Sequence, residues 1–224
     1  LQWVIQVPFA IPGETVRAKV YRNRKRYIEA DLVEVLEASK DRTEPKCGLF
    51  SNCGGCQYQH MSLAAQREAK RQQVEELLER LGGLELPEGV SIESPLGTEE
   101  AYGYRSKLTP HFEPPTKTAA GEIRSIGFKS NRGRFIIDVD ECAIATPGIN
   151  EAMESARETA KAEARERFSS GRKAKGGTLL LRDTPSHGVV HEPLQVVSEM
   201  VRNLDLQFRA GDFFQNNPYA LPLM

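Results

Sequence analysis

The sequence predicts an α+β chain in which part of a small OB-like β-barrel is followed by an α+β domain that carries cysteines. Apolar and polar residues alternate within residues 1–46, as in half-buried strands, and a helical apolar period marks a long helix further on. Cysteines and glycines gather between these two patterns. No apolar run approaches the ~20 residues of a membrane span, so we expect no membrane-embedded part.

Residues 1–46 are expected to form about three strands of an antiparallel meander. Apolar residues dominate positions 2–7, Val and Ala alternate with Arg and Lys over 15–21, and a similar alternation runs over 27–36. A Pro-Gly pair marks the first turn, and a run of basic residues marks the second. Since OB-like barrels usually have about five strands, we expect a partial barrel that continues beyond the N-terminal end of this sequence.

Two long helices are expected after the barrel. Ser62 can cap a helix over residues 63–81, where apolar residues recur with helical spacing and a Gly-Gly pair follows the end. Thr146-Pro147 is a good start for a second helix, which ends near Phe168.

Short strands are expected around the second helix. Before it they lie at residues 105–112, 124–129 and 134–139, of which the last two form a hairpin with a Gly-containing turn. More short strands follow residue 177. The central region is therefore mixed α+β.

The charge of the chain is balanced. Thirty Lys and Arg stand against 31 Asp and Glu, which gives a formal net charge of −1. Any affinity for nucleic acid must therefore come from local clusters of basic residues.

Four cysteines are the most informative residues. Cys47, Cys53 and Cys56 have the spacing C-x5-C-x2-C, and Cys142 lies far downstream. The N-terminal residues lack the basic and apolar regions of a secretory signal, so we expect reduced thiols in an intracellular, reducing compartment. The cytoplasm is favoured, and an organelle or the nucleus remains open.

Four thiolates fit an iron–sulfur cluster or a structural zinc ion. Small residues in a Gly-rich loop let the backbone fold around a metal and turn amide N–H groups toward sulfur. Zinc ribbons usually present two C-x2-C pairs, whereas this chain has three cysteines together and one apart. The spacing therefore favours a cluster, with zinc as the runner-up and four unligated thiols as the third interpretation.

Five motifs in one order resemble the RNA 5-methyluridine methyltransferases that use S-adenosylmethionine. The resemblance covers nearly the whole chain. The motifs are Cys47 to His60, Gln66 to Val74, Tyr104 to Lys107, Gly127-Phe-Lys with Asp138 to Cys142, and Phe213-Phe-Gln-Asn-Asn217.

The resemblance implies a division into domains. Residues 1–46 would be the end of a TRAM domain, an OB-like barrel that contacts RNA. Residues 47–212 would be the central domain, with the helix at 63–81 packed on the methyltransferase domain. Residues 213–224 would begin that Rossmann-like catalytic domain, the rest of which is expected to be missing from this chain.

The resemblance also implies ligands and binding residues. Cys47, Cys53, Cys56 and Cys142 would hold a 4Fe-4S cluster, and Gln215 would contact S-adenosylmethionine. The partner would be RNA, with tRNA favoured, and no protein partner is evident. Two groups of basic and aromatic residues are the expected RNA contacts, since cations meet phosphates and rings stack on bases. They are Arg17, Lys19, Arg22, Arg24, Lys25 and Arg26 in the barrel and Tyr104, Arg105 and Lys107 in the central domain.

Each RNA group has a simpler interpretation. The basic run can be a solvated hairpin tip, because Glu29, Asp31, Glu34 and Glu37 follow it. The second group can be an ordinary strand entry with packing tyrosines. Likewise, Gln215 can be an exposed amide at the end of the chain.

The family's chemistry needs a cysteine that adds to carbon 6 of uracil and a carboxylate that removes the carbon 5 proton. All four cysteines are assigned to the cluster, and no Gly-rich nucleotide loop joins a strand to a helix. We therefore assign no catalytic residue and expect these 224 residues to be inactive alone.

Two other function classes remain as alternatives. One is a standalone RNA-binding module with a structural four-cysteine zinc or iron–sulfur site and no catalysis. The other, a radical methylthiotransferase with its own TRAM domain, would need C-x3-C-x2-C and ranks last because the spacing here is C-x5-C-x2-C.

Overall fold

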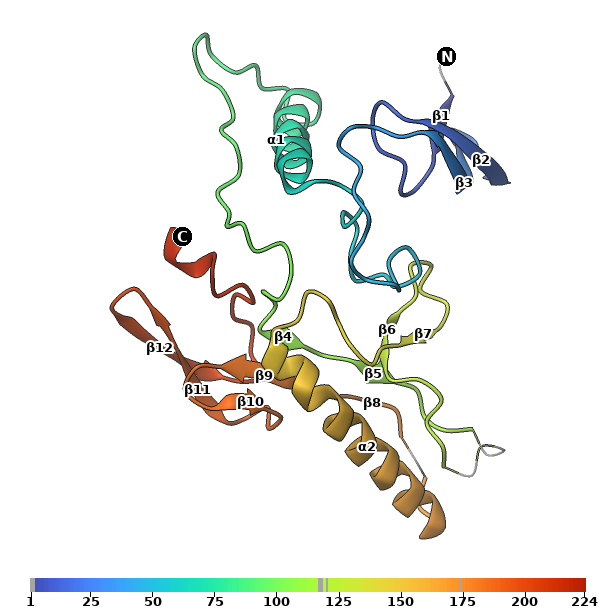
Figure 1. Cartoon of the computed structure of the whole chain (residues 1–224), viewed down its shortest axis with the longest axis vertical. Coiled ribbons are helices and arrows are strands. Elements are labelled where there is room, and N and C mark those ends of the chain that lie inside the picture. The colour runs from blue at the N-terminus through green and yellow to red at the C-terminus, as the bar shows by residue number, and fades with distance from the viewer. Residues whose placement is uncertain (1–2, 117–118, 120, 174) are drawn as a thin grey trace. The chain divides into compact units, whose positions relative to one another are not determined.

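The computed structural model describes residues 3–116, 119, 121–173 and 175–224. The chain divides into two compact units, residues 1–51 with 56–95 and residues 52–55 with 96–224. Each unit has its own strands and one long helix (Figure 1). Within the described ranges, no helix is both long and apolar enough to cross a membrane.

Three strands form the sheet of the first unit: β1 (Val4–Gln6), β2 (Thr15–Asn23) and β3 (Tyr27–Glu37). β3 lies in the centre, antiparallel to β2 and parallel to β1. The meander prediction, which places β2 in the centre, is therefore wrong in its strand order. The connection over residues 7–14 is long enough to carry the chain across β3, so β2 pairs with the far edge of that strand.

A buried ion pair fixes this connection. Both oxygens of the Glu14 carboxylate bind the Arg42 guanidinium, one of them at 2.7 Å from Nη2. The backbone N–H groups of Ile11 and Ser39 also donate to Glu14, at 3.0 and 3.4 Å, while Arg42 donates to the Phe9 carbonyl at 2.7 Å. The Glu14 side chain is 0% exposed. Residues 9–14 and 39–42 are thereby tied together.

Helix α1 (Leu63–Arg80) confirms the first helix prediction to within one residue. Ser62 caps it, because its hydroxyl accepts the N–H of Ala65 at 3.2 Å. None of its described residues is buried, and the apolar Val74 and Leu77 remain about half exposed.

The second unit contains short antiparallel strands. They are β4 (Lys107–Leu108), β5 (His111–Phe112), β6 (Gly127–Lys129), β7 (Ile136–Asp138), β8 (Gly177–Thr178), β9 (Leu181–Thr184), β10 (Gly188–Val190), β11 (Val196–Val201) and β12 (Leu204–Arg209). One sheet has the order β7-β6-β5-β8 and another β10-β9-β4, while β11 and β12 form a hairpin. The expected hairpin of residues 124–139 is confirmed as β6 and β7.

The single strand expected at residues 105–112 is instead two strands in two sheets. β4 pairs with β9, and β5 pairs with β6 and β8. Pro110 lies between β4 and β5 and has no N–H to donate to a ladder. Its carbonyl still accepts the N–H of Leu179 at 2.8 Å. A proline at this point therefore allows the chain to leave one sheet and enter the next.

Helix α2 (Pro147–Ser169) confirms the second helix prediction, with Thr146 as its N-cap and Pro147 in its first turn. One face of α2 is buried, and its apolar residues form two core clusters with the strands. The first joins Ile149 and Met153 to Leu108, Ala145 and Leu181, and the second joins Ala160 and Ala164 to Ile123 and Ile126. Because α2 spans both clusters, it positions the segments on which the candidate site depends.

Candidate functional site

The loop that carries three of the cysteines is held by its own backbone and by Gln59. The N–H of Cys47 donates to the Gln59 side-chain oxygen at 3.2 Å, and the carbonyl of Cys47 accepts the N–H of Phe50 at 3.0 Å. No disulfide joins any of the four cysteines, and each is of intermediate exposure. The Cys142 side chain packs against the core cluster that contains Ile149 and Met153.

Cys53 lies against the β6–β7 hairpin. Gly54, the next residue, donates its N–H to the Lys129 carbonyl at 3.0 Å. A Cβ added at Gly54 would lie 3.1 Å from that oxygen, so glycine is needed for this close approach. The Gly-rich composition of the loop therefore fixes Cys53 beside the turn of the hairpin.

Cys142 is held from both sides by one residue of α2. The Asn150 side-chain oxygen accepts the N–H of Cys142 at 3.0 Å, and its NH2 group donates to the Cys142 carbonyl at 3.2 Å. This paired contact orients the backbone that carries the fourth thiol. Sequence reasoning missed Asn150, although an amide four residues after an N-cap threonine is a visible signal.

Arg157 of α2 holds the segment just before Cys142. Its side chain, 7% exposed, pairs with Asp138 and Asp140 at 2.8 Å each. It also donates to the carbonyls of Ile126 and Val139, at 2.6 and 2.9 Å. Burial is the largest single effect and would raise the pKa of Asp138, but the hydrogen bonds from Arg157 and the Ile126 N–H, together with the charges of Arg157 and Lys161, outweigh it and lower that pKa. The aspartates of the Asp138-to-Cys142 motif thus bind a buried cation.

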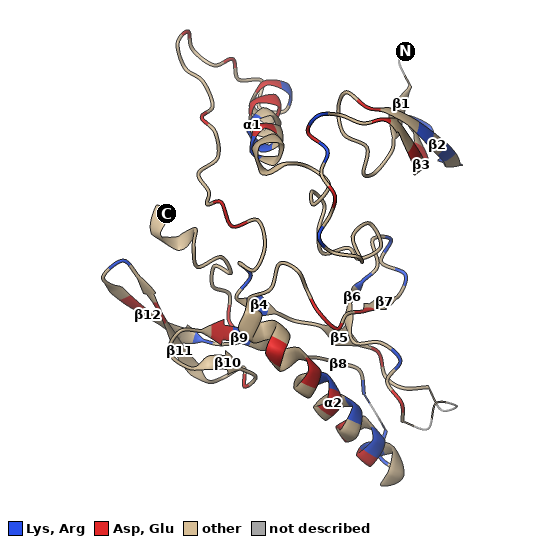
Figure 2. Ribbon diagram, in the orientation of Figure 1, with Lys and Arg blue, Asp and Glu red and all other residues tan. Residues whose placement is uncertain are grey.

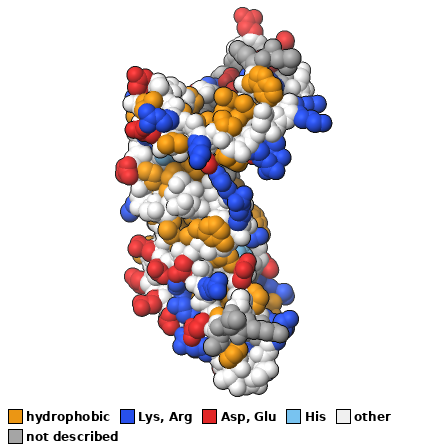
Figure 3. Space-filling model, turned by 90° about the vertical axis from the view of Figure 1, so that its right-hand side faces the viewer, with side chains coloured by type: hydrophobic (Ala, Val, Ile, Leu, Met, Phe, Trp, Pro, Cys, Tyr) orange, Lys and Arg blue, Asp and Glu red, His pale blue; other side chains and the backbone are white. Residues whose placement is uncertain are grey.

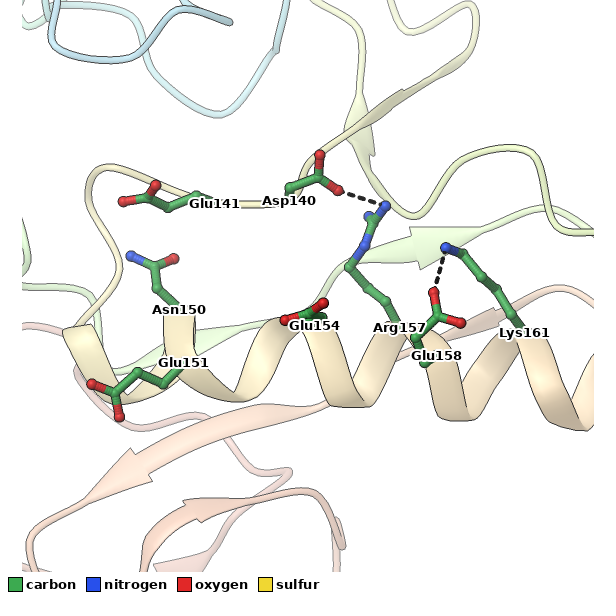
Figure 4. A pocket seen from close by; sticks show the side chains of 8 residues that line it. All are labelled: Asp140, Glu141, Asn150, Glu151, Glu154, Arg157, Glu158 and Lys161. Carbon is green, nitrogen blue, oxygen red and sulfur yellow. Dashed lines mark hydrogen bonds and ion pairs between the residues drawn. The ribbon is translucent and has the colours of Figure 1, made fainter.

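Asp140, Asn150 and Arg157 help to line a hollow of about 520 Å³ beside α2 (Figure 4). Five acidic residues line it, yet Arg157 binds Asp140 and Lys161 binds Glu158. Part of the negative charge that lines the hollow is thus neutralised by cations of the same chain.

No three or more Cys, His, Asp or Glu side chains come together as a metal site among the residues that the structure describes. Cys47 and Cys56 belong to the first unit, and Cys53 and Cys142 belong to the second. Four cysteines of intermediate exposure fit the chemistry of a thiolate-bound metal centre. The four-cysteine shell stays a prediction.

The basic run of the first unit lies on β2 and the tip that follows it (Figure 2). Arg17 pairs with Glu34 across the sheet, Lys19 lies opposite Asp31, and Arg24 pairs with Glu29 at 3.0 Å. The hydrogen bond from Arg24 lowers the pKa of Glu29. The acidic strand thus neutralises much of the run, while Lys25 and Arg26 at the tip are exposed.

Apolar side chains also reach the surface of this sheet (Figure 3). Tyr21 on β2 is 47% exposed, and Val20 beside it is similarly exposed. The mixture of basic and aromatic side chains expected for RNA contact is therefore present at the surface of the sheet.

In the second RNA group, the two cations bind the protein itself. The Arg105 guanidinium donates to the Lys107 carbonyl at 3.1 Å. The Lys107 amine donates to the carbonyls of Gly211 and Asp212, at 2.7 and 3.0 Å. Burial, and next the nearby Arg182 cation, lower the pKa of Lys107. The polar contacts of Lys107 thus support the C-terminal segment.

The same segment carries Gln215. Phe214 stacks on Phe208 with 4.0 Å between ring centroids, and the carbonyl of Asn216 accepts the N–H of Ser106 at 2.8 Å. Both neighbours of Gln215 are therefore anchored, whereas Gln215 itself is exposed. The structure thus presents the Gln215 amide at the surface of a well-held segment.

Arg182 of β9 also holds the C-terminal segment. This role could not be predicted from the sequence. Arg182 is 1% exposed and donates to the carbonyls of Ala210 and Asp212, at 3.2 and 3.0 Å, and to the Asn216 side-chain oxygen at 3.2 Å. Its guanidinium lies 5.2 Å from the Phe208 ring centroid. Burial lowers the pKa of Arg182 and raises that of the nearby Glu199.

No protein-family model matches this chain. Among curated proteins, it is 36% identical over 222 residues to the tRNA (uracil(54)-C(5))-methyltransferase of Schizosaccharomyces pombe, which covers 96% of this chain and 41% of that protein. It is 38% identical over 149 residues to a 23S rRNA (uracil(1939)-C(5))-methyltransferase of Halomonas elongata, covering 66% of this chain and 29% of that protein. The homologues of this chain are thus RNA uracil-C5 methyltransferases, and it spans about two fifths or less of the length of these two relatives.

A solved structure shares the fold. The tRNA (uracil-54, C5)-methyltransferase of Pyrococcus abyssi, in complex with S-adenosyl-L-homocysteine, aligns with a TM-score of 0.59 at 21% identity over 98% of this chain and 58% of that one. The prediction that the catalytic methyltransferase domain is missing is therefore wrong. That prediction rested on the order of motifs in the resemblance, which places the start of the methyltransferase domain at residues 213–224, whereas the shared fold extends over 98% of the chain.

Proposed function

We propose that this chain is part of an RNA uracil-C5 methyltransferase that uses S-adenosylmethionine and acts on tRNA. The observation that carries the proposal is the 36% identity to a tRNA (uracil(54)-C(5))-methyltransferase over 222 residues. That match covers 96% of this chain. An RNA-binding module without catalysis accounts less well for such a match.

The reaction explains what the protein must supply. Carbon 5 of uracil becomes nucleophilic only when a thiolate has added to carbon 6. Carbon 5 then takes the methyl group, a carboxylate removes its proton, and the thiolate leaves carbon 6. S-adenosylmethionine supplies the methyl group. The target base must also leave its stack to reach these groups.

In this proposal, four thiolates hold a 4Fe-4S cluster: those of Cys47, Cys53, Cys56 and Cys142. The contacts of Gln59, Gly54 and Asn150 support it, because each fixes the backbone of one proposed ligand or of its neighbour. Zinc is the alternative occupant. With all four cysteines bound, none is left to add to carbon 6, so we expect the 224 residues alone to leave uridine unmethylated.

The proposal also divides the chain into the three parts that the motifs suggest. Residues 1–46 form a TRAM-like RNA-binding part, residues 47–212 the central domain, and residues 213–224 the entry to the cofactor site. Gln215 contacts S-adenosylmethionine, which its exposed amide between two anchored neighbours supports. The protein works in a reducing intracellular compartment, with the cytoplasm favoured.

Metal analysis tests the cluster. Anaerobically purified protein should contain about four irons and four sulfides per chain, and Cys53→Ser should lose most of the iron together with the brown colour. Asn52→Ala, an exposed neighbour on the same loop, is the matched control and should keep both. Stoichiometric zinc in place of iron, or unchanged iron in Cys53→Ser, would contradict this part of the proposal.

A further inference from the structure

We infer that a hollow on the four-stranded sheet of the second unit binds one unpaired base of single-stranded RNA together with its phosphate. The hollow has a volume of about 360 Å³. β5, β8, β7 and the turn between β6 and β7 line it. The inference rests on the proposed function, to which it adds an RNA contact surface outside the two predicted groups.

Two phenylalanines give the hollow its apolar surface. Phe112 of β5 lies close to Gly177 of β8, where an added Cβ would be 2.8 Å from the ring atom Cζ. Glycine at 177 therefore leaves room for the ring. Phe135, just before β7, is 59% exposed, so its ring gains little from folding. An exposed ring beside a half-buried one forms a surface on which a flat base can stack.

The turn that carries Phe135 is held in place by Ser130. The N–H of Ser130 donates to the Phe135 carbonyl at 2.8 Å, and the N–H of Gly133 donates to the Ser130 carbonyl at 2.7 Å. The Ser130 hydroxyl accepts the N–H of Arg134 at 3.1 Å. Because the backbone is already ordered, stacking on Phe135 requires little further loss of conformational freedom.

Two cations stand at the rim. Lys129 and Arg134 line the hollow and are exposed, and among the described residues neither forms an ion pair with an acidic side chain. Only one acidic residue, Glu113, lines the same hollow. By contrast, Arg17 and Arg24 of the barrel pair with glutamates, and Lys107 binds backbone carbonyls. The hollow thus offers two exposed cations that pair with no acidic side chain of the described residues.

The combination selects a nucleotide. Two phosphate-binding cations beside two rings match a base with its phosphate, because every base has a flat face that stacks and every phosphate is negative. An acidic peptide would use the cations and leave the rings without a function. Duplex RNA would keep its bases stacked inside the helix and could not reach Phe112.

Binding of a ten-nucleotide, uridine-rich single-stranded RNA to the full 224-residue chain tests the inference. Phe135→Ala should weaken binding about tenfold. The double substitution Lys129→Gln with Arg134→Gln should reduce the slope of log affinity against log salt concentration by about one to two units. Phe168→Ala and Arg80→Gln replace an exposed ring and an exposed cation elsewhere, and should bind like the wild type. An RNA containing 5-iodouridine should crosslink to residues 129–136.

Three results would overturn the inference. If the wild type binds RNA and the Phe135 and Lys129/Arg134 variants bind equally well with no crosslink to the turn, the hollow is not the site, although the proposed function stands. If the wild type binds no RNA, the inference fails together with the RNA part of the proposed function. If polyglutamate competes as well as RNA and Phe135→Ala has no effect, the hollow is an acid-binding surface.

Discussion

At the scale of single residues, three arginines with buried or half-buried side chains help to explain why loop segments have defined positions in this chain. Arg42, Arg157 and Arg182 each bind backbone carbonyls of a loop as well as a side chain. Guanidinium groups suit this role because several donors are fixed in one plane. Each of these arginines therefore helps to position the segment whose carbonyl groups it binds.

Arg182→Met should destabilise the second unit. The substitution keeps much of the side-chain volume but leaves the carbonyls of Ala210 and Asp212 and the Asn216 side chain without their donor. Losing several bonds to a buried charge costs about 2–4 kcal/mol in the free energy of unfolding. Urea titration measures this. Arg182→Lys keeps the charge but has fewer donors, so its free energy of unfolding should lie between those of the wild type and Arg182→Met. Arg209→Met on exposed β12 should change stability little. A wild-type midpoint for Arg182→Met would contradict the account.

Glu14 predicts a stability difference that depends on pH. Its hydrogen bond to Arg42 lowers its pKa from 4.5 to about 2. The folded pKa lies below the ordinary value, so the stabilisation is present above pH 4.5 and is lost as the pH falls toward 2. At neutral pH, Glu14→Gln should cost roughly 1–3 kcal/mol, because Arg42 remains partly accessible to water.

Unfolding measured at several pH values checks this prediction. The difference between wild type and Glu14→Gln should shrink steadily below pH 4.5. Glu85→Gln, an exposed acid in the same unit, is the control and should show little difference at any pH. A difference for Glu14→Gln that stays constant down to acid pH would show that the ion pair is not its origin.

At the scale of elements, helices could be predicted well and strand partners could not. Ser62 and Thr146 are local signals, so both helices begin where the sequence places them. β1, β3 and β2 pair in an order that the sequence did not predict, and the Glu14–Arg42 contact beside them joins residues far apart in the chain. Pro110 splits one expected strand into β4 and β5. Such long-range contacts leave no periodic pattern in the sequence.

The candidate site could likewise be predicted only in part from the sequence. The cysteine spacing and the Phe213-to-Asn217 motif are visible in the sequence, but the residues that hold them are not. Asn150, Arg157 and Arg182 lie on other elements, and only the folded chain brings them to Cys142, Asp138 and Asn216. Lys107 was expected to contact RNA because it is basic, whereas its amine binds two carbonyls of the chain.

The tip between β2 and β3 carries a prediction for RNA binding. Replacing Arg22, Arg24 and Arg26 together with glutamine should weaken tRNA binding and flatten its salt dependence, since fewer counterions are released. The expected flattening is less than three units of slope, because Arg24 already pairs with Glu29. Filter binding at several salt concentrations measures it. Replacing Lys70, Arg71 and Arg80 of α1 is a control of equal charge. Unchanged affinity and slope would leave the tip as a solvated turn.

At the scale of the whole molecule, the neutral net charge conceals an uneven distribution. The formal charge is −1, yet six basic residues fall between residues 17 and 26 without an acid, and the hollow at Phe135 has two cations and one acid. Local clusters of this kind suffice for phosphate contact. In the proposed function these clusters share one role, which is recognition of the RNA to be methylated.

Methyl transfer by the complete protein tests the central claim most directly. The enzyme is incubated with S-adenosylmethionine carrying a labelled methyl group and with tRNA lacking modifications, and the tRNA is then digested and its nucleosides identified by mass spectrometry. The account predicts labelled 5-methyluridine as the product. Label in any other nucleoside, or tRNA that is bound but never methylated, would contradict it.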